Sequence, residues 1–196
     1  GVRQGDEVIV PSLSFIATAN SIMHCGARPV FIDVDANTFN INPEAIEGAI
    51  TKRTKVIMPV HQVGMPADMD RINAVAKRYG MKVMEDAACA IGSKYKGRLI
   101  GSNSEMACFS FHPRKIVTTA EGGMITTDND GYAKELKLLR HHGMNISDTM
   151  RYGAKKLVIE HYPVVGYNYR MSDVHAAIGI VQMKKLGFTF GMPHQT

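Results

Sequence analysis

The chain has 196 residues, of which 45% are hydrophobic, and this length and composition suit one globular core and exclude a disordered chain. Its formal net charge of +5 comes from lysines and arginines interspersed with acidic residues, so it does not indicate nucleic-acid binding. The three cysteines lie far apart and form no C-x-x-C pair, which argues against a disulfide framework or a zinc site and favours the cytoplasm.

Apolar runs of strand type alternate with amphipathic stretches along most of the chain. In chain order, the predicted elements are a strand (7–12), a helix (15–25), a strand (29–34), a helix (42–50), a strand (55–60), a helix (67–80), strands (82–87, 106–111 and 122–127) and helices (132–143 and 172–186). Alternation of this kind predicts an α/β fold, in which helices flank a mainly parallel sheet. No stretch approaches the length of a membrane span, and the first residues lack a signal-peptide pattern.

Particular residues mark the ends of several predicted helices. Asn42 and Ser172 stand at N-cap positions, and Pro43 follows Asn42 at the first helical position. Gly26 and Gly80 stand where helices should stop. The helix over 67–80 is expected to bury one face, formed by Met69, Ile72, Val75 and Tyr79.

Polar and ionisable side chains follow four of the predicted strands. They are Ser12 to Phe15, then His61, then Glu85 and Asp86, then Ser110, His112 and Lys115. Because ligands of open α/β sheets bind beyond the carboxyl ends of the strands, we expect these groups to converge on one rim and form a site. Each of them taken singly has a structural or solvated role as its alternative.

Two of these residues indicate a particular chemistry. Asp86 is flanked by small apolar residues, so its carboxylate needs a partner, and a cation such as Lys115 is one candidate. A lysine in a confined site instead forms a Schiff base with a carbonyl compound. A carboxylate that holds the pyridine nitrogen and a lysine that holds the aldehyde are the two groups that pyridoxal phosphate requires.

Six segments carry a family resemblance: GDEVIVPSLSFIATANS, PVHQVGMPADMD, EDAACAIG, CFSFHPRK, EGGM and GYNYRMSD. In this order they resemble the DegT/StrS family of pyridoxal-phosphate-dependent nucleotide-sugar aminotransferases, which have the aspartate-aminotransferase fold type I. The resemblance extends from about Gly5 to Leu186, and its specificity comes from the six motifs together.

The resemblance implies a role for each matching residue. Lys115 matches the lysine that forms the Schiff base with the cofactor, and Asp86 matches the aspartate that pairs with the pyridine nitrogen. Phe15 matches an aromatic residue that stacks on the cofactor ring. Ser110 matches a phosphate-binding serine, and Asn168 matches an asparagine that reaches the phosphate from the other subunit of a homodimer.

Three further positions are implied less directly. His112 and Arg170 match positions near the substrate pocket of the family. Cys89 stands at a cofactor-binding position where the family commonly has glutamine, and a thiol is a weaker hydrogen-bonding group toward the cofactor's phenolic oxygen.

Some of these residues also have simple structural interpretations. Phe15 could be a core aromatic at the start of a helix, and Ser110 could cap its turn. Asn168 could bond its own loop backbone.

The resemblance also implies how the chain is organised. Residues 1–186 correspond to a partial cofactor-binding large domain, and residues 187–196 form a tail that departs from the family pattern. The family's earlier phosphate-binding cup and its small C-terminal domain find no counterpart, so we expect the chain to be a fragment of a longer protein.

The function implied by the resemblance is transfer of an amino group from an amino acid, expected to be glutamate, to a keto group of a nucleotide-linked sugar. One alternative is a sugar dehydratase of the same family, but that branch has histidine at the position of Lys115. The other is a non-catalytic or regulatory module that keeps the fold without a working site.

Overall fold

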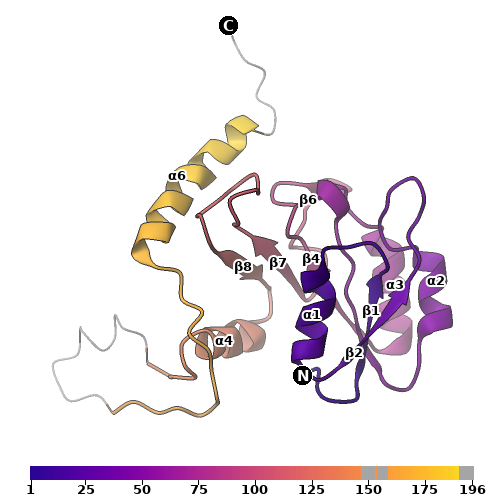
Figure 1. Ribbon diagram of the computed structural model, residues 1–196, viewed down its shortest axis with the longest axis horizontal. Helices are drawn as coiled ribbons and strands as arrows, with labels where there is room; N and C mark the ends of the chain where they lie inside the picture. The colour runs from indigo at the N-terminus through magenta and orange to yellow at the C-terminus, as the bar shows by residue number, and fades with distance from the viewer. Residues whose placement is uncertain (147–152, 154–158, 190–196) are drawn as a thin grey trace, which may run out of the picture.

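A six-stranded sheet in the order β2-β1-β3-β4-β7-β8 forms the centre of the computed structural model, which describes residues 1–146, 153 and 159–189 (Figure 1). Its strands are β1 (Glu7–Pro11), β2 (Arg28–Ile32), β3 (Thr54–Ile57), β4 (Lys82–Asp86), β7 (Met106–Ser110) and β8 (Gly123–Thr126). All adjacent pairs are parallel except β7 and β8, which are antiparallel. The predicted mainly parallel α/β sheet is therefore confirmed.

Helices cover both faces of this sheet, as the alternation of β and α units predicts. These helices are α1 (Ile16–His24), α2 (Pro43–Ala49) and α3 (Met69–Tyr79), whereas α4 (Asp130–Leu139) and α6 (Asp173–Thr189) follow the sheet in the chain. Side chains alternate along β1, so Ile9 packs with the α2 and α3 side of the core, whereas Val8 and Val10 pack with Ile22 of α1 on the other side. Figure 1 shows α1 on one side of the sheet and α2 and α3 on the other.

The predicted helix ends are confirmed by their hydrogen bonds and dihedral angles. Asn42 Oδ1 accepts from the backbone N–H of Glu44 at 3.0 Å, ahead of Pro43. Gly80 ends α3 with a φ of 65°, a left-handed conformation that glycine adopts without strain. Ser172 Oγ accepts from the N–H of His175 at 3.3 Å at the start of α6.

One residue of the predicted apolar face of α3 lies elsewhere. Met69, Ile72 and Val75 are buried as expected, but Tyr79 keeps 46% of its surface exposed. Its hydroxyl donates to a carboxylate oxygen of Glu47 on α2 at 3.4 Å. The polar tip of the tyrosine therefore keeps the last turn of the helix at the surface.

Three short elements were not predicted. Strands β5 (Lys94–Tyr95) and β6 (Arg98–Leu99) pair as a hairpin, and η1 (Gln62–Gly64) is a single 3₁₀ turn. The hairpin turns through Lys96 and Gly97, which both have a positive φ, as a tight two-residue turn requires. Strands of two residues are too short for an alternating pattern to reveal them.

The last helix continues beyond its predicted end. Helix α6 includes residues 187–189, so the first three residues of the expected tail are helical. It lies on the β8 side of the molecule, away from the core that α1, α2 and α3 cover (Figure 1). It leaves apolar side chains exposed, among them Val174, Ile180 and Val181. In the described part of the chain, no helix is long and apolar enough to cross a bilayer.

A buried carboxylate joins three segments at the amino end of β1. Glu7 is fully buried, and it accepts hydrogen bonds from Thr51 Oγ1 at 2.6 Å, Arg28 Nη2 at 2.7 Å and Arg53 Nη2 at 2.8 Å. The hydrogen bonds from Thr51 and Arg28, followed by that from Arg53, lower the pKa of Glu7 to about 2. The cluster therefore ties β1 to β2 and to the turn before β3.

We expect the contribution of Glu7 to stability to depend on pH. Because its pKa is lowered in the folded state, its stabilisation is present above the unfolded value near 4.5 and is lost as the pH falls toward 2. Glu7→Gln should lower the free energy of unfolding at pH 7 by roughly 2 kcal/mol. The difference from the wild-type protein should shrink in urea unfolding measured at pH 4 and pH 3.

An exposed ion pair provides the matched control for this variant. Glu44 pairs with Arg71 at 3.1 Å, and the Glu44 side chain is 74% exposed. Glu44→Gln should cost less than about 1 kcal/mol at any pH. A difference between wild type and Glu7→Gln that stays constant from pH 7 to pH 3 would contradict the assigned pKa.

Candidate functional site

The candidate site lies at the edge of the sheet where parallel strands end. Strands β1, β3, β4 and β7 run in the same direction, so their carboxyl ends meet at one edge. The chain order reverses at β1, which lies between β2 and β3. Open α/β sheets bind ligands in the crevice outside such a point.

Asp86 ends β4 and is bonded to the neighbouring segments through its backbone and its side chain. Its backbone N–H donates to the carbonyl of Pro59 at 2.9 Å, and its carbonyl accepts from the N–H of His61 at 3.0 Å. Its Oδ2 accepts from Thr18 Oγ1 at 2.7 Å, and its Oδ1 accepts from the N–H of Ala88 at 3.1 Å. In the part of the chain that the structure describes, a hydroxyl and an amide, and not a cation, are therefore the donors to this carboxylate.

Lys115 approaches the turn that carries Asp86. Its side chain is half-buried, and Nζ donates to Cys89 Sγ at 3.1 Å. The lysine is itself held in a turn, in which its backbone N–H donates to the carbonyl of His112 at 2.9 Å. The structure therefore brings Lys115, Cys89 and Asp86 together at one edge, as the rim hypothesis requires.

Phe15 and Ser110 belong to the same edge. Phe15 immediately precedes α1, and 72% of its surface is exposed, so its interpretation as a core aromatic was wrong. Ser110 ends β7, and its Oγ accepts from the N–H of His112 at 3.3 Å, which confirms that it caps a turn. His112 Nδ1 in turn accepts from the N–H of Arg114 at 3.3 Å. This hydrogen bond orients the imidazole within its own loop.

Asn168 and Arg170 belong to a different segment. Asn168 Oδ1 accepts from Arg170 Nε at 3.2 Å, as the loop interpretation expected for a side chain that bonds locally. The backbone of Asn168 pairs with His141, just beyond the end of α4. Nearby, the rings of Tyr167 and Tyr169 stack with centroids 4.9 Å apart. This segment is exposed.

Two residues expected at the rim point into the protein instead. His61 and Glu85 are both buried, and His61 Nε2 lies 2.8 Å from Glu85 Oε2. His61 Nδ1 accepts from the N–H of Ala67 at 3.0 Å, which assigns the proton to Nε2, and Ser104 donates to the other oxygen of Glu85. The expectation that this pair joins the site was wrong, because strand alternation turns Glu85 to the opposite face from Asp86.

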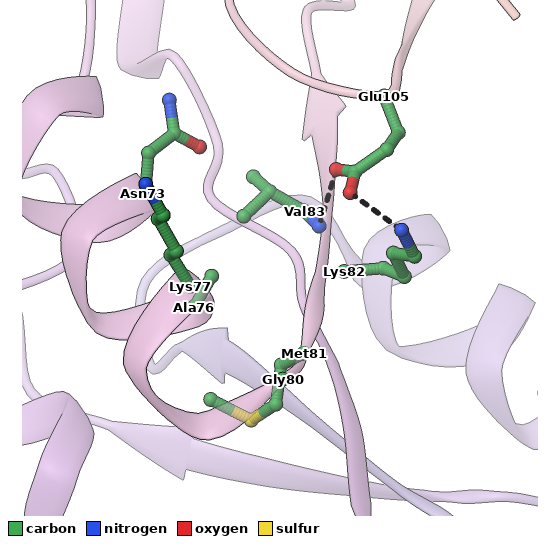
Figure 2. A pocket seen from close by; sticks show the side chains of 8 residues that line it. All are labelled: Asn73, Ala76, Lys77, Gly80, Met81, Lys82, Val83 and Glu105. Carbon is green, nitrogen blue, oxygen red and sulfur yellow. Dashed lines mark hydrogen bonds and ion pairs between the residues drawn. The ribbon is translucent and has the colours of Figure 1, made fainter.

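A cavity of about 310 Å³ lies at the other end of β4. Figure 2 shows Lys82 and Glu105 on its wall, with Glu105 bonded both to Lys82 Nζ at 3.1 Å and to the N–H of Val83 at 3.0 Å. Because it lies near the amino end of the strand, it is remote from Asp86 and from the edge where the candidate groups meet.

Sequence reasoning missed Thr18 and Ser14. Thr18 lies on the buried side of α1 with 5% of its surface exposed, and its hydroxyl reaches Asp86. Ser14 Oγ lies 2.7 Å from Thr18 Oγ1. A threonine among the apolar residues that a helix turns toward a sheet is the signal that would have indicated it.

The cysteines of the chain differ in environment. Cys25 and Cys89 are exposed, whereas Cys108 on β7 lies mostly buried beside Asp86. Burial, with a smaller contribution from the negative charge of Asp86, raises the pKa of the Cys108 thiol to about 11. Cys108 therefore stays protonated at neutral pH.

We expect the thiols to react in two classes. Because the thiolate is the nucleophile, Cys25 and Cys89 should be alkylated by iodoacetamide at pH 8, while Cys108 should react at least about a hundredfold more slowly. Raising the pH toward 11 should speed the reaction of Cys108 more than that of Cys25. Peptide mass spectrometry of the folded protein measures all three sites, and equal labelling of Cys108 and Cys25 at pH 8 would refute the assignment.

Comparison with known proteins supports the family resemblance over most of the chain. The model of the DegT/DnrJ/EryC1/StrS aminotransferase family matches residues 1–190. The chain is 49% identical over 186 residues to GDP-perosamine synthase from Caulobacter vibrioides, a match that covers 95% of this chain and 47% of that protein. The chain thus spans about half the length of this curated relative.

Solved structures show the same fold. An aminotransferase from Psychrobacter cryohalolentis matches with a TM-score of 0.88 and 39% identity, over 95% of this chain and 48% of that one. NtdA from Bacillus subtilis, solved with bound cofactor PMP, matches with a TM-score of 0.82 and 38% identity, over 96% of this chain and 40% of that one.

Proposed function

The chain belongs to the DegT/DnrJ/EryC1/StrS aminotransferase family, and we propose that it is the cofactor-binding part of a longer pyridoxal-phosphate-dependent nucleotide-sugar aminotransferase. The observation that carries this proposal is the meeting of Lys115, Cys89 and Asp86 at the carboxyl edge of the sheet. The similarity of the chain to a GDP-perosamine synthase and to solved aminotransferase structures supports it.

The residues at this edge fit pyridoxal phosphate. Asp86 accepts one described hydrogen bond on each oxygen, which leaves acceptor capacity for a pyridinium N–H. Lys115 presents a primary amine beside the turn that carries Asp86. Phe15 has an exposed ring for stacking, and Ser110 has a hydroxyl for the phosphate. When bound, the cofactor supplies an electron-accepting ring conjugated to an aldehyde carbon.

Each of these side chains has a distinct task in the proposed reaction. Asp86 keeps a proton on the pyridine nitrogen by accepting a hydrogen bond from it. Lys115 holds the cofactor between turnovers, and its released amine then moves a proton at the substrate carbon. Phe15 excludes water from one face of the ring. Cys89 stands where glutamine is common in the family. Its polarisable thiol would offer the cofactor a weaker hydrogen bond than an amide.

The proposed substrates are an amino-acid donor, for which we infer glutamate, and a nucleotide-linked keto sugar. Lys115 favours amino transfer over sugar dehydration, since only an amine can hold the cofactor covalently. Residues 1–186 form part of the large domain in this proposal. The three free cysteines support a cytoplasmic location.

We expect the full-length protein to acquire a visible absorbance band when pyridoxal phosphate is added. Borohydride should then fix the cofactor to Lys115 by reducing the C=N bond, and mass spectrometry should locate the added mass there. Lys115→Ala should lack the band and lose roughly a thousandfold or more in kcat. No band in a folded wild-type protein would refute the proposal and favour a non-catalytic module.

Thiol protection gives an independent measurement of the same site. Bound pyridoxal phosphate should slow alkylation of Cys89, which contacts Lys115, and leave Cys25 unaffected. Both thiols are exposed, so Cys25 is an internal control for reagent access. Equal protection of the two would indicate a general stabilisation and not binding at Lys115.

We further propose that the enzyme is a homodimer in which Asn168 completes the partner's site. The family resemblance suggests this role, and the exposed apolar surface of the segment supports it. That surface comprises Ile159, Tyr162, Val165, Tyr167 and Tyr169. In this proposal a second subunit supplies its Asn168 to the phosphate.

Mixing two inactive variants tests this arrangement. Lys115→Ala and Asn168→Ala should each be strongly impaired, and subunit exchange between them should form heterodimers that contain one site with both native residues. Random mixing of a C2 dimer should then restore about one quarter of the wild-type activity. If Asn168 served its own subunit, the mixture would stay inactive.

A further inference from the structure

We propose that Thr18 is a positioning residue for the Asp86 carboxylate and that Ser14 supports it through a hydrogen-bonded hydroxyl chain. This inference rests on the proposed function, because it concerns how the protein presents Asp86 to the pyridine nitrogen. These hydrogen bonds connect the residues at the start of α1 with the end of β4. Thr18 and Asp86 are 68 residues apart in the sequence.

The direction of each hydrogen bond follows from the chemistry of the groups. Thr18 Oγ1 lies 2.7 Å from Asp86 Oδ2, and an ionised carboxylate only accepts, so Thr18 donates. A hydroxyl has one proton. Ser14 Oγ, which lies 2.7 Å from Thr18 Oγ1, must therefore donate to Thr18. Both hydroxyl groups are polarised toward the carboxylate, and bonds in such a chain strengthen one another.

The other hydrogen bonds of Asp86 leave Thr18 to set the orientation of its carboxylate. The backbone of Asp86 is fixed by its bonds to Pro59 and His61, so only the side-chain torsions remain free. The N–H of Ala88 holds one oxygen and Thr18 holds the other, which sets the plane of the carboxylate. Thr18 is 5% exposed, so without its hydroxyl no bulk water would be well placed to replace the lost donor.

The same segment carries the aromatic ring proposed to stack on the cofactor. Phe15 lies between Ser14 and Thr18 in sequence, and the N–H of Thr18 donates to the carbonyl of Phe15 at 3.1 Å. Any shift of this first helical turn would therefore move the ring and the donor to Asp86 together. The hydroxyl chain thus keeps the ring face and the carboxylate in one spatial relationship.

The test compares full-length Thr18→Val with Thr18→Ser. Valine keeps the shape of threonine and removes only the hydroxyl, whereas serine keeps the donor. Titration of the visible band measures the dissociation constant for pyridoxal phosphate. This constant should rise about tenfold in Thr18→Val, because a hydrogen bond to a charged carboxylate is lost. Thr18→Ser should stay within about threefold of the wild-type value. The pH midpoint of the visible band should move in Thr18→Val and not in Thr18→Ser.

Two further variants keep the result interpretable. Ser14→Ala removes only the outer donor of the chain and should weaken cofactor binding about two- to threefold, even if Thr18→Val folds poorly. Thr54→Val is the matched control, because Thr54 is also a buried threonine that bonds a carboxylate. Its hydroxyl lies 3.5 Å from Glu7, at the amino end of β1 and therefore away from the candidate site. It should reduce stability without changing the dissociation constant.

The outcomes separate the inference from the function on which it rests. Wild-type cofactor affinity and an unmoved pH midpoint in Thr18→Val and Ser14→Ala, with a lowered melting temperature alone, would overturn the positioning role. A wild-type protein without any visible band would instead refute the proposed function, and the inference with it. Rescue by serine together with normal behaviour of Thr54→Val would support the inference.

Discussion

Backbone pairing at the end of β4 is the constraint on which the candidate site depends. Asp86 bonds to Pro59 and His61 on one side, and on the other the N–H of Ala87 donates to the carbonyl of Cys108. These bonds fix the position of the strand end against both neighbouring segments. They therefore also fix the start of the turn that contains Cys89. Lys115 then needs to reach only that turn to be near the carboxylate.

Three acidic residues of the sheet differ in how fully the fold satisfies their carboxylates. Glu7 is fully buried and bonded to two arginines, and Glu85 is fully buried and bonded to His61 and Ser104. Their donors are supplied within the fold, and both act as ties between segments. Asp86 is half-buried, and its donors within the described residues are the neutral groups of Thr18 and Ala88, so it keeps acceptor capacity for a ligand. That difference makes Asp86 the carboxylate suited to bind a ligand.

Large apolar side chains stay exposed in several parts of the molecule, among them Phe15, Phe31 and Val63. The core is closed around β1, β3 and β4, where α1, α2 and α3 cover both faces. Toward β8 and α6, large side chains such as Met124 and Val181 stay exposed.

The sequence by itself determined the order of the main strands and helices and the helix caps at Asn42 and Ser172, because periodicity and capping act over a few neighbouring positions. It also singled out Asp86 and Lys115 as candidates for the site. Only the tertiary structure decided that His61 and Glu85 face inward, that Cys89 is the partner of Lys115, and that Thr18 bonds Asp86. These contacts join residues that are far apart along the chain. They depend on which strands pair and which helix packs against them, and no local pattern encodes that pairing.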